Sequence, residues 1–300
     1  MRNVSGPVAP LVVSLSLVGA LAACSSAENG DSSGDLGATA SLASSSMPTG
    51  SGSGGQAVQS DRVPVGPSDP QPVRGSVEVV DTFAHNPTLF TQGLQVVDDQ
   101  IYESTGRLGR STVERRPLRE VEPTVRIPMA DDEFGEGLAV TPDALWTLTW
   151  QNGVAHNRDP QTLEVRSEVP YEGEGWGLCF DGSQLVMSNG SDELTFRDPD
   201  TFEPTGTVSV TAGGTPVTQL NELDCSDGTV LANVWMTDEI VRIDPSTGAV
   251  TAIYDAAELE QPRPNDPDAV LNGVAALPGS ENVLLTGKLW SQMYEVRLVE

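Results

Sequence analysis

The sequence predicts an all-β protein, and three observations lead to that prediction. After residue 76, no long segment shows the 3.6-residue period of an amphipathic helix. Short apolar segments occur instead, separated by turn-forming pairs such as Asp98-Asp99, Asp181-Gly182 and Asp227-Gly228. A short motif also recurs five times in the same region. These features are typical of short strands joined by tight turns in a repeated unit.

The recurring motif is a polar or aromatic residue, then Gly or Glu, then an aliphatic residue. Its copies are Gln92-Gly93-Leu94, Glu136-Gly137-Leu138, Trp176-Gly177-Leu178, Asn221-Glu222-Leu223 and Asn272-Gly273-Val274. The aliphatic residues are 44, 40, 45 and 51 positions apart, and each copy precedes a turn and a second strand. A period of about forty residues with about four strands predicts a five-bladed β-propeller over residues 76–300. An all-β sandwich is the alternative, but it does not predict such a repeat.

The first residues predict an exported lipoprotein. Arg2 is the only charged side chain before the apolar segment 11–21, which is short for a membrane-spanning helix. Small residues at 22 and 23 directly precede Cys24. We therefore expect a lipoprotein signal peptide over 1–23 and a lipid on Cys24 that anchors the protein to the outer face of the bacterial cell membrane. An ordinary secretory signal with an incidental cysteine is the alternative.

A flexible linker is expected to follow the signal peptide. Residues 24–75 are rich in Ser and Gly and lack a hydrophobic period, so we expect them to be disordered. The first 82 residues contain no aromatic side chain, so the hydrophobic core must lie in the remainder of the chain. The linker would hold the folded domain away from the membrane.

The charge of the chain excludes some partners. Its 43 acidic and 16 basic residues give a net charge of −27, which argues against binding nucleic acid or an anionic membrane surface. The acidity could attract cationic N-termini, although solubility or adaptation to salt is the simpler explanation. The only histidines, His85 and His156, lack a ligand-like pattern. We therefore expect no catalytic metal and no cofactor. A structural cation in the central channel of the propeller is an open alternative.

Two further cysteines occupy equivalent positions in successive repeats. Cys179 and Cys225 each lie two residues before an Asp-Gly turn. Because an exported domain permits disulfides and equivalent inner strands lie side by side, we predict a Cys179–Cys225 disulfide. Two buried free thiols are the alternative.

The repeats also predict where a site would form. If each motif begins the innermost strand of a blade, its first residues converge on one mouth of the channel: Gln92, Glu136, Trp176, Asn221 and Asn272. The next strands would bring Glu103, Trp150, Asn233 or Trp235, and Lys288 nearby. Such an aromatic-walled pocket with few polar groups is typical of a small-ligand site. Lys288 is the only lysine in the chain, which suggests a functional amine rather than an incidental surface residue.

Seven segments together resemble the plant and bacterial type of glutaminyl-peptide cyclotransferases, also called glutamine cyclotransferases. They are Phe90-Thr91-Gln92-Gly93-Leu94, Tyr102-Glu103-Ser104-Thr105-Gly106, Phe134-Gly135-Glu136-Gly137-Leu138, Gly175-Trp176-Gly177-Leu178, Leu220-Asn221-Glu222-Leu223, Ala232-Asn233-Val234-Trp235-Met236-Thr237-Asp238 and Thr286-Gly287-Lys288-Leu289-Trp290. The likeness runs from about His85 to Leu298. It implies a five-bladed propeller that converts the N-terminal glutamine of peptides or proteins to pyroglutamate and releases ammonia. We expect a monomer.

The resemblance also implies which residues form the site. Gln92, Glu136, Asn221 and Lys288 would be its polar groups, and Trp150, Trp176 and Trp235 its aromatic wall. Cyclisation requires proton transfer, stabilisation of an oxyanion and exclusion of water. We assign proton transfer to Glu136, oxyanion stabilisation to Lys288 and Asn221, whose roles could be exchanged, and substrate orientation to Gln92.

Other interpretations remain at this point. Glu136 could be a structural carboxylate, and the tryptophans could serve blade packing. A non-catalytic lipoprotein propeller that binds peptides or glycans is the main functional alternative. A propeller hydrolase or lactonase would require metal-binding carboxylates and histidines in the channel, and the sequence does not supply them.

Overall fold

The computed structural model describes residues 70–259 and 266–300, which form strands and contain no helix. Accordingly, no helix among these residues is long and apolar enough to cross a membrane. The expected signal peptide 1–23, Cys24 and most of the linker 24–75 lie outside the described residues. The first strand, β1 (Val73–Ala84), begins before the domain start that we expected at residue 76.

Three antiparallel sheets each contain four consecutive strands. The first holds β2 (Thr91–Val97), β3 (Gln100–Thr105), β4 (Thr112–Pro117) and β5 (Val125–Pro128). The second holds β6 (Gly135–Val140), β7 (Leu145–Thr149), β8 (Val154–Arg158) and β9 (Val165–Pro170). The third holds β10 (Leu178–Phe180), β11 (Leu185–Met187), β12 (Glu193–Arg197) and β13 (Pro204–Ser209), and a hairpin of β14 (Thr211–Ala212) and β15 (Thr215–Pro216) follows.

An eight-stranded sheet contains the remaining strands and both ends of the described chain. One half is the meander β16 (Leu220–Ser226), β17 (Thr229–Val234), β18 (Glu239–Ile243) and β19 (Val250–Asp255). The other half is β20 (Leu271–Ala276), β21 (Val283–Gly287) and β22 (Gln292–Val299), completed by β1. Strand β1 pairs antiparallel with β22 and parallel with β19, so the N-terminal strand joins the two halves.

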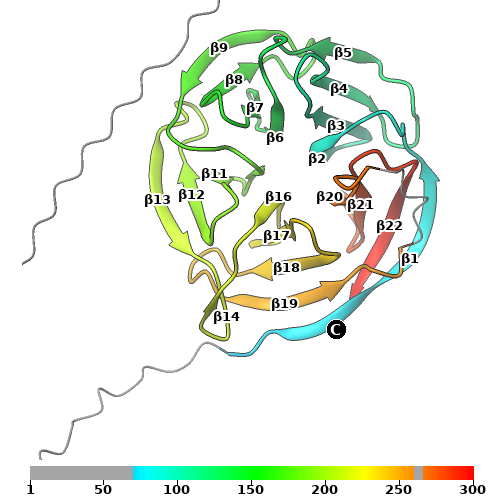
Figure 1. Ribbon diagram of the computed structural model, residues 1–300, viewed down its shortest axis with the longest axis vertical. Coiled ribbons are helices and arrows are strands. Elements are labelled where there is room, and N and C mark those ends of the chain that lie inside the picture. Colours follow the sequence, from blue (N-terminus) through cyan, green and yellow to red (C-terminus); the bar gives the residue numbers. More distant parts are fainter. Residues whose placement is uncertain (1–69, 260–265) are drawn as a thin grey trace, which may run out of the picture. The chain divides into compact units, whose positions relative to one another are not determined.

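The sheets of the folded unit are arranged in a ring (Figure 1). Strands β2, β6, β16 and β20 lie nearest its centre, and β5, β9, β13, β19 and β1 lie at its outside. Each of these four inner strands carries a copy of the repeat motif, as the sequence predicts, and the remaining copy leads into β10, which contacts β6 and β16. The residues at the start of these strands therefore lie near the centre of the ring.

Glycine in the repeat motif lets neighbouring inner strands approach closely. A Cβ atom at Gly93 would lie 2.6 Å from the Leu138 nitrogen, and one at Gly137 would lie 2.5 Å from the Leu178 nitrogen. In the fourth repeat, Glu222 takes this place and its side chain is fully buried.

The Glu222 carboxylate joins three inner strands. It accepts the N–H groups of Leu94 on β2, at 3.0 Å, and Val274 on β20, at 2.7 Å. Burial raises the pKa of this carboxyl group well above its usual value. Glu222, which replaces glycine at the middle position of the motif, therefore bridges strands across the centre of the ring.

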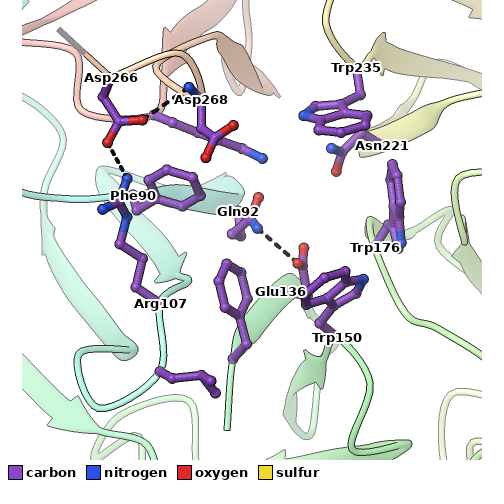
Figure 2. Close-up of a pocket in the computed structure, with 13 residues that line it drawn as sticks. Phe90, Gln92, Arg107, Glu136, Trp150, Trp176, Asn221, Trp235, Asp266 and Asp268 are labelled. Atoms are coloured by element: carbon purple, nitrogen blue, oxygen red, sulfur yellow. Dashed lines mark hydrogen bonds and ion pairs between the residues drawn. The ribbon is translucent and has the colours of Figure 1, made fainter. Parts of the chain in front are cut away.

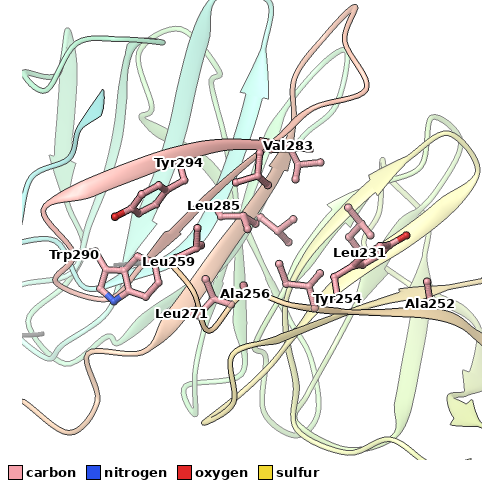
Figure 3. Close-up of a cluster of buried hydrophobic side chains, with 13 residues drawn as sticks. Leu231, Ala252, Tyr254, Ala256, Leu259, Leu271, Val283, Leu285, Trp290 and Tyr294 are labelled. Carbon is pink, nitrogen blue, oxygen red and sulfur yellow. The ribbon is translucent and has the colours of Figure 1, made fainter. Parts of the chain in front are cut away.

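Apolar side chains fill the space between adjacent repeats. Figure 3 shows one such cluster, in which Leu231 and Tyr254 from the β16–β19 half pack near Leu271 and Leu285 from the β20–β22 half. These side chains are almost completely buried, so they contribute apolar burial to the contact between repeats.

A disulfide joins two inner strands. Cys179 on β10 and Cys225 on β16 are bonded, with their Cα atoms 5.4 Å apart. The predicted pairing is confirmed, and the alternative of two free thiols is excluded. Equivalent positions in successive repeats were sufficient to predict it.

Candidate active site

A pocket of about 580 Å³ opens at one side of the inner strands (Figure 2). It is lined by Phe90, Gln92, Arg107, Leu108, Phe134, Glu136, Trp150, Trp176, Asn221, Trp235, Asp266, Asp268 and Lys288. All seven residues predicted from the sequence to form the polar groups and aromatic wall of the site are among them. The repeats therefore bring together side chains that are distant in the sequence.

Equivalent backbone positions place residues at the ends of the second strands. The N–H groups of Trp150, Trp235 and Lys288 each donate to a carbonyl oxygen of the loop before the first strand of their own repeat, at 2.9 Å in every case. Lys288 therefore takes the place in its repeat that tryptophan takes in two others. The same backbone position in different repeats therefore supplies both the indole side chains and the single amine.

Gln92 and Glu136 form a buried pair at the base of the pocket. The Gln92 amide nitrogen donates to Glu136 at 2.8 Å, as Figure 2 shows. Asn272 Nδ2 donates to the Gln92 amide oxygen at 3.2 Å and to the Thr91 carbonyl at 3.0 Å. These bonds fix the orientation of the Gln92 amide, so its NH₂ group faces the carboxylate.

The environment makes Glu136 a stronger base than an exposed carboxylate. Burial raises its pKa well above the usual value, and the negative charge of Glu174 adds to this shift. The positive charge of Lys288 acts in the opposite direction. A carboxyl group with a raised pKa is suited to accept and return a proton near neutral pH.

The Lys288 amine is buried but has no hydrogen bond or ion pair within the described residues. Its side chain is nearly enclosed, with the residue 4% exposed, and Nζ lies 5.0 Å from the centre of the Phe90 ring. Burial lowers the pKa of Lys288, while the carboxylates of Glu136 and Asp268 oppose that change. Asn221 Oδ1 also lacks a hydrogen-bond partner in this part of the chain. Buried polar groups are normally paired, so both are available to a ligand.

The three predicted tryptophans form a connected wall. The indole N–H groups of Trp150 and Trp176 donate to the same oxygen of Glu174, at 2.8 and 3.0 Å. Trp176 contacts Trp235 edge to face, with ring centroids 5.6 Å apart. Since all three line the pocket, their contacts also hold its aromatic surface in place.

Two glycines leave room for aromatic rings that line the pocket. Gly106 donates its N–H to Phe90, and a Cβ atom there would overlap the Phe134 ring. Gly190 follows β11 with a positive φ of 79°, and a Cβ atom there would lie 2.7 Å from the Trp176 ring. Both glycines are required for space around a ring that lines the pocket.

Three residues of the site were not predicted from the sequence, although the repeat marks their positions. Phe90, Phe134 and Glu174 lie two positions before Gln92, Glu136 and Trp176. The two phenylalanines line the pocket in edge contact, with centroids 6.2 Å apart, and Glu174 holds the indoles. The position two residues before the first three motif copies could therefore have identified them.

The remaining missed residues lie in loops outside the repeat. Arg107, Leu108, Asp266 and Asp268 line the mouth of the pocket, and Arg107 forms an ion pair with Asp266. No periodic pattern marks these positions. Their place depends on how the loops fold over the inner strands.

Three residues expected near the mouth do not line the pocket. Asn272 supports Gln92, and Asn233 Oδ1 accepts the N–H of Gly273 at 2.9 Å. Glu103 is fully buried and bonds to His85 at 3.1 Å and Arg116 at 2.6 Å. Each of these side chains instead forms hydrogen bonds with buried polar groups of the surrounding sheets.

The described residues do not bring together three or more His, Cys, Asp or Glu side chains in a group that could hold a metal ion. The pocket combines the Glu136 carboxyl group, two carboxamides and an amine in aromatic surroundings, and Arg107, Asp266 and Asp268 line its mouth. Independence from metal remains a prediction.

The fold and the pocket define an all-β protein with a central, aromatic-walled site for a small polar ligand. The family described as glutamine cyclotransferase matches residues 54–298. The glutaminyl-peptide cyclotransferase of Arabidopsis thaliana is 34% identical over 227 residues, which cover 74% of this chain and 71% of the relative. The crystal structure of Myxococcus xanthus glutaminyl cyclase is 37% identical, with a TM-score of 0.72, and the match covers 76% of this chain and 99% of the other.

The chain belongs to the glutamine cyclotransferase family. The resemblance found in its sequence segments is confirmed.

Proposed function

We propose that the protein is a glutaminyl-peptide cyclotransferase that converts N-terminal glutamine to pyroglutamate with release of ammonia. The observation that supports this most strongly is the buried Gln92–Glu136 pair in one pocket with the Lys288 amine, which has no partner among the described residues. Family membership supports the same reaction. Its substrates would be peptides or proteins with a free N-terminal glutamine.

The reaction needs one proton to move between two nitrogen atoms of the substrate. The α-amine attacks the side-chain amide carbon, a C–N bond forms, and the carbonyl oxygen becomes an oxyanion. Glu136 accepts the proton released by the attacking nitrogen. When the oxyanion collapses, the original C–N bond breaks and Glu136 returns the proton to the leaving ammonia.

Lys288 and Asn221 would stabilise the oxyanion. Both side chains line the pocket, and the Lys288 amine and the Asn221 Nδ2 group would be the donors. Donors held in place before the reaction stabilise developing charge without reorganisation. Gln92 would orient the substrate amide beside Glu136.

The aromatic wall would exclude water. Water attack on the same amide carbon would yield glutamate instead of pyroglutamate. Trp150, Trp176 and Trp235 would also hold the glutamine side chain close to its own α-amine, so proximity supplies part of the acceleration.

The proposed function is tested by incubating the full chain with a Gln-Ala dipeptide and measuring released ammonia. Excess EDTA is present because the proposed roles need no metal. The control is the N-acetylated dipeptide, which has no free amine to attack. Ammonia from the free dipeptide alone supports the function; no ammonia from either would contradict it, and activity that requires added Zn²⁺ would contradict the metal-independent mechanism.

We also propose that the ring is a five-bladed propeller. The antiparallel meander β16–β19 and the set β20–β22 with β1 would each count as one blade, beside the three four-stranded sheets. The five repeat motifs support this division. The parallel pairing of β1 with β19 would then be a contact between two blades.

The protein would act outside the cell as a monomer anchored by a lipid on Cys24. The apolar segment 11–21 followed by small residues and Cys24 supports this proposal. Residues 24–75 would separate the enzyme from the membrane surface.

A further inference from the structure

A second pocket, of about 290 Å³, lies beside the first. Its lining residues are Thr88, Leu89, Phe90, Thr105, Gly106, Arg107, Arg110, Thr112, Arg126 and Leu289. It contains three arginines and no carboxylate among the described residues that line it. Phe90 and Arg107 line both pockets, so the two are adjacent.

This cluster of arginines is unexpected in a chain with a net charge of −27. Two of the three have partners, since Arg126 bonds to Glu114 at 2.7 Å and Arg107 pairs with Asp266. Glu114 is fully buried and also binds Arg116 at 2.7 Å, so two guanidinium groups share its charge. Arg110 is exposed and has no ion pair within the described residues.

The loop that carries Arg107 and Arg110 is held in a defined conformation. Arg107 has a positive φ of 99°, which is unusual for a residue with a side chain. Its carbonyl accepts the Arg110 N–H and the Ser111 hydroxyl, both at 2.9 Å. The Arg107 guanidinium lies 4.4 Å from the centre of the Phe90 ring. These contacts fix Arg107 at the boundary between the two pockets.

We propose that the second pocket, lined by Arg107, Arg110 and Arg126, binds a carboxylate of the peptide substrate downstream of its N-terminal glutamine. The inference rests on the proposed function. With glutamine in the central pocket, the rest of the peptide must leave through the mouth, where Arg107 lies. Guanidinium groups bind carboxylates through charge-assisted hydrogen bonds. The preferred substrates would carry an acidic residue shortly after glutamine, or end there in a free carboxylate.

The test compares rates for tetrapeptide amides with glutamine first and alanine elsewhere. Glutamate or lysine replaces alanine at the second, third or fourth position in turn. The expected result is a kcat/KM about three to ten times higher for glutamate than for alanine at one position, through a lower KM. Lysine at that position should give a lower kcat/KM than alanine. The glutamate advantage should shrink in about 0.5 M NaCl, because salt screens partly exposed charges.

The ratio of the glutamate rate to the alanine rate identifies the site. The variant Arg110→Glu should reduce this ratio below one. The matched control is Arg166→Glu on β9, an exposed arginine paired with Asp159, which should keep the wild-type ratio. A peptide of alanine residues that ends at the same position in a free carboxylate should also be cyclised faster than its amide. This advantage should be seen with the wild type and lost in Arg110→Glu.

Failure of the proposed function can be distinguished from failure of the carboxylate subsite. If no glutamine peptide is cyclised, the proposed function is wrong. If all peptides are cyclised but glutamate gives no advantage at any position, or if Arg110→Glu keeps the wild-type ratio, the function stands and the carboxylate subsite is refuted.

Discussion

Glu136 and Lys288 occupy the same pocket with pKa values shifted towards each other. Burial raises the pKa of Glu136 and lowers that of Lys288. The mechanism needs Glu136 ionised and Lys288 protonated. We therefore expect kcat to rise with pH as Glu136 loses its proton and to fall at higher pH as Lys288 loses its own.

Replacing Glu174 by glutamine should move the acidic limb of that profile to lower pH. The negative charge of Glu174 raises the pKa of Glu136, so its removal lowers that pKa. Glutamine retains an oxygen that can accept an indole N–H. The measurement is the pH dependence of kcat, with Glu172→Gln as an exposed control nearby. An acidic limb that stays in place or moves to higher pH would contradict this electrostatic coupling.

Gly190 offers a test of the aromatic wall. Gly190→Ala should lower kcat/KM about tenfold to a hundredfold, because the added methyl group would displace the Trp176 ring. Gly182→Ala is the matched control, since Gly182 also has a positive φ but a Cβ atom there would meet nothing within 4 Å. Both variants carry backbone strain, but only the first should lose activity beyond its loss of stability. If both variants lost the same activity, the position of the Trp176 ring would not matter for the reaction.

At the scale of the strands, Glu222 shows how one residue connects several elements. Glu222→Ala should lower the free energy of unfolding by about 2–4 kcal/mol, because two buried N–H groups lose their acceptor. Urea unfolding measures this change. Glu78→Ala removes an exposed carboxylate paired with Arg297 and should leave stability almost unchanged. A Glu222→Ala protein as stable as the wild type would show that these bonds contribute little.

The sequence predicted the elements whose pattern is local. Apolar segments between turns indicated strands, and the motif located the inner strands. The pairing of β1 with β19 and β22 was beyond such reasoning, because β1 precedes the first motif and its partners lie at the other end of the folded part. Most of β1 is also exposed, so its residues show little periodicity.

The difference between local pattern and tertiary packing also explains which pocket residues could be predicted. Residues at repeat positions, such as Glu136 and Asn221, could be predicted because the repeat fixes where they converge. Arg107 and Asp266 could not, because their loops follow no period and their contact depends on tertiary packing. The role of Glu222 as a bridge was equally hidden, although its place in the motif was visible.

At the scale of the whole molecule, anchoring and catalysis should be separable. Cys24→Ser should move the protein from the membrane fraction to the soluble fraction, because it removes the proposed lipid site. Specific activity should stay unchanged, since the pocket lies in residues 90–288. Fractionation after a salt wash, with an activity assay on each fraction, measures both effects. Retention of the serine variant in the washed membrane would exclude the lipid as the anchor.

The central claim is that Glu136 and Lys288 perform the chemistry in one pocket, and kcat/KM for a Gln-peptide in Lys288→Ala tests it most directly. We expect a loss of about 10²–10³-fold, the range typical of removing one preorganised donor. Lys288→Arg should restore little, since a guanidinium is larger and planar. Glu136→Gln should be at least as damaging, because it removes proton transfer. A correctly folded Lys288→Ala protein with near-normal kcat/KM would contradict the claim.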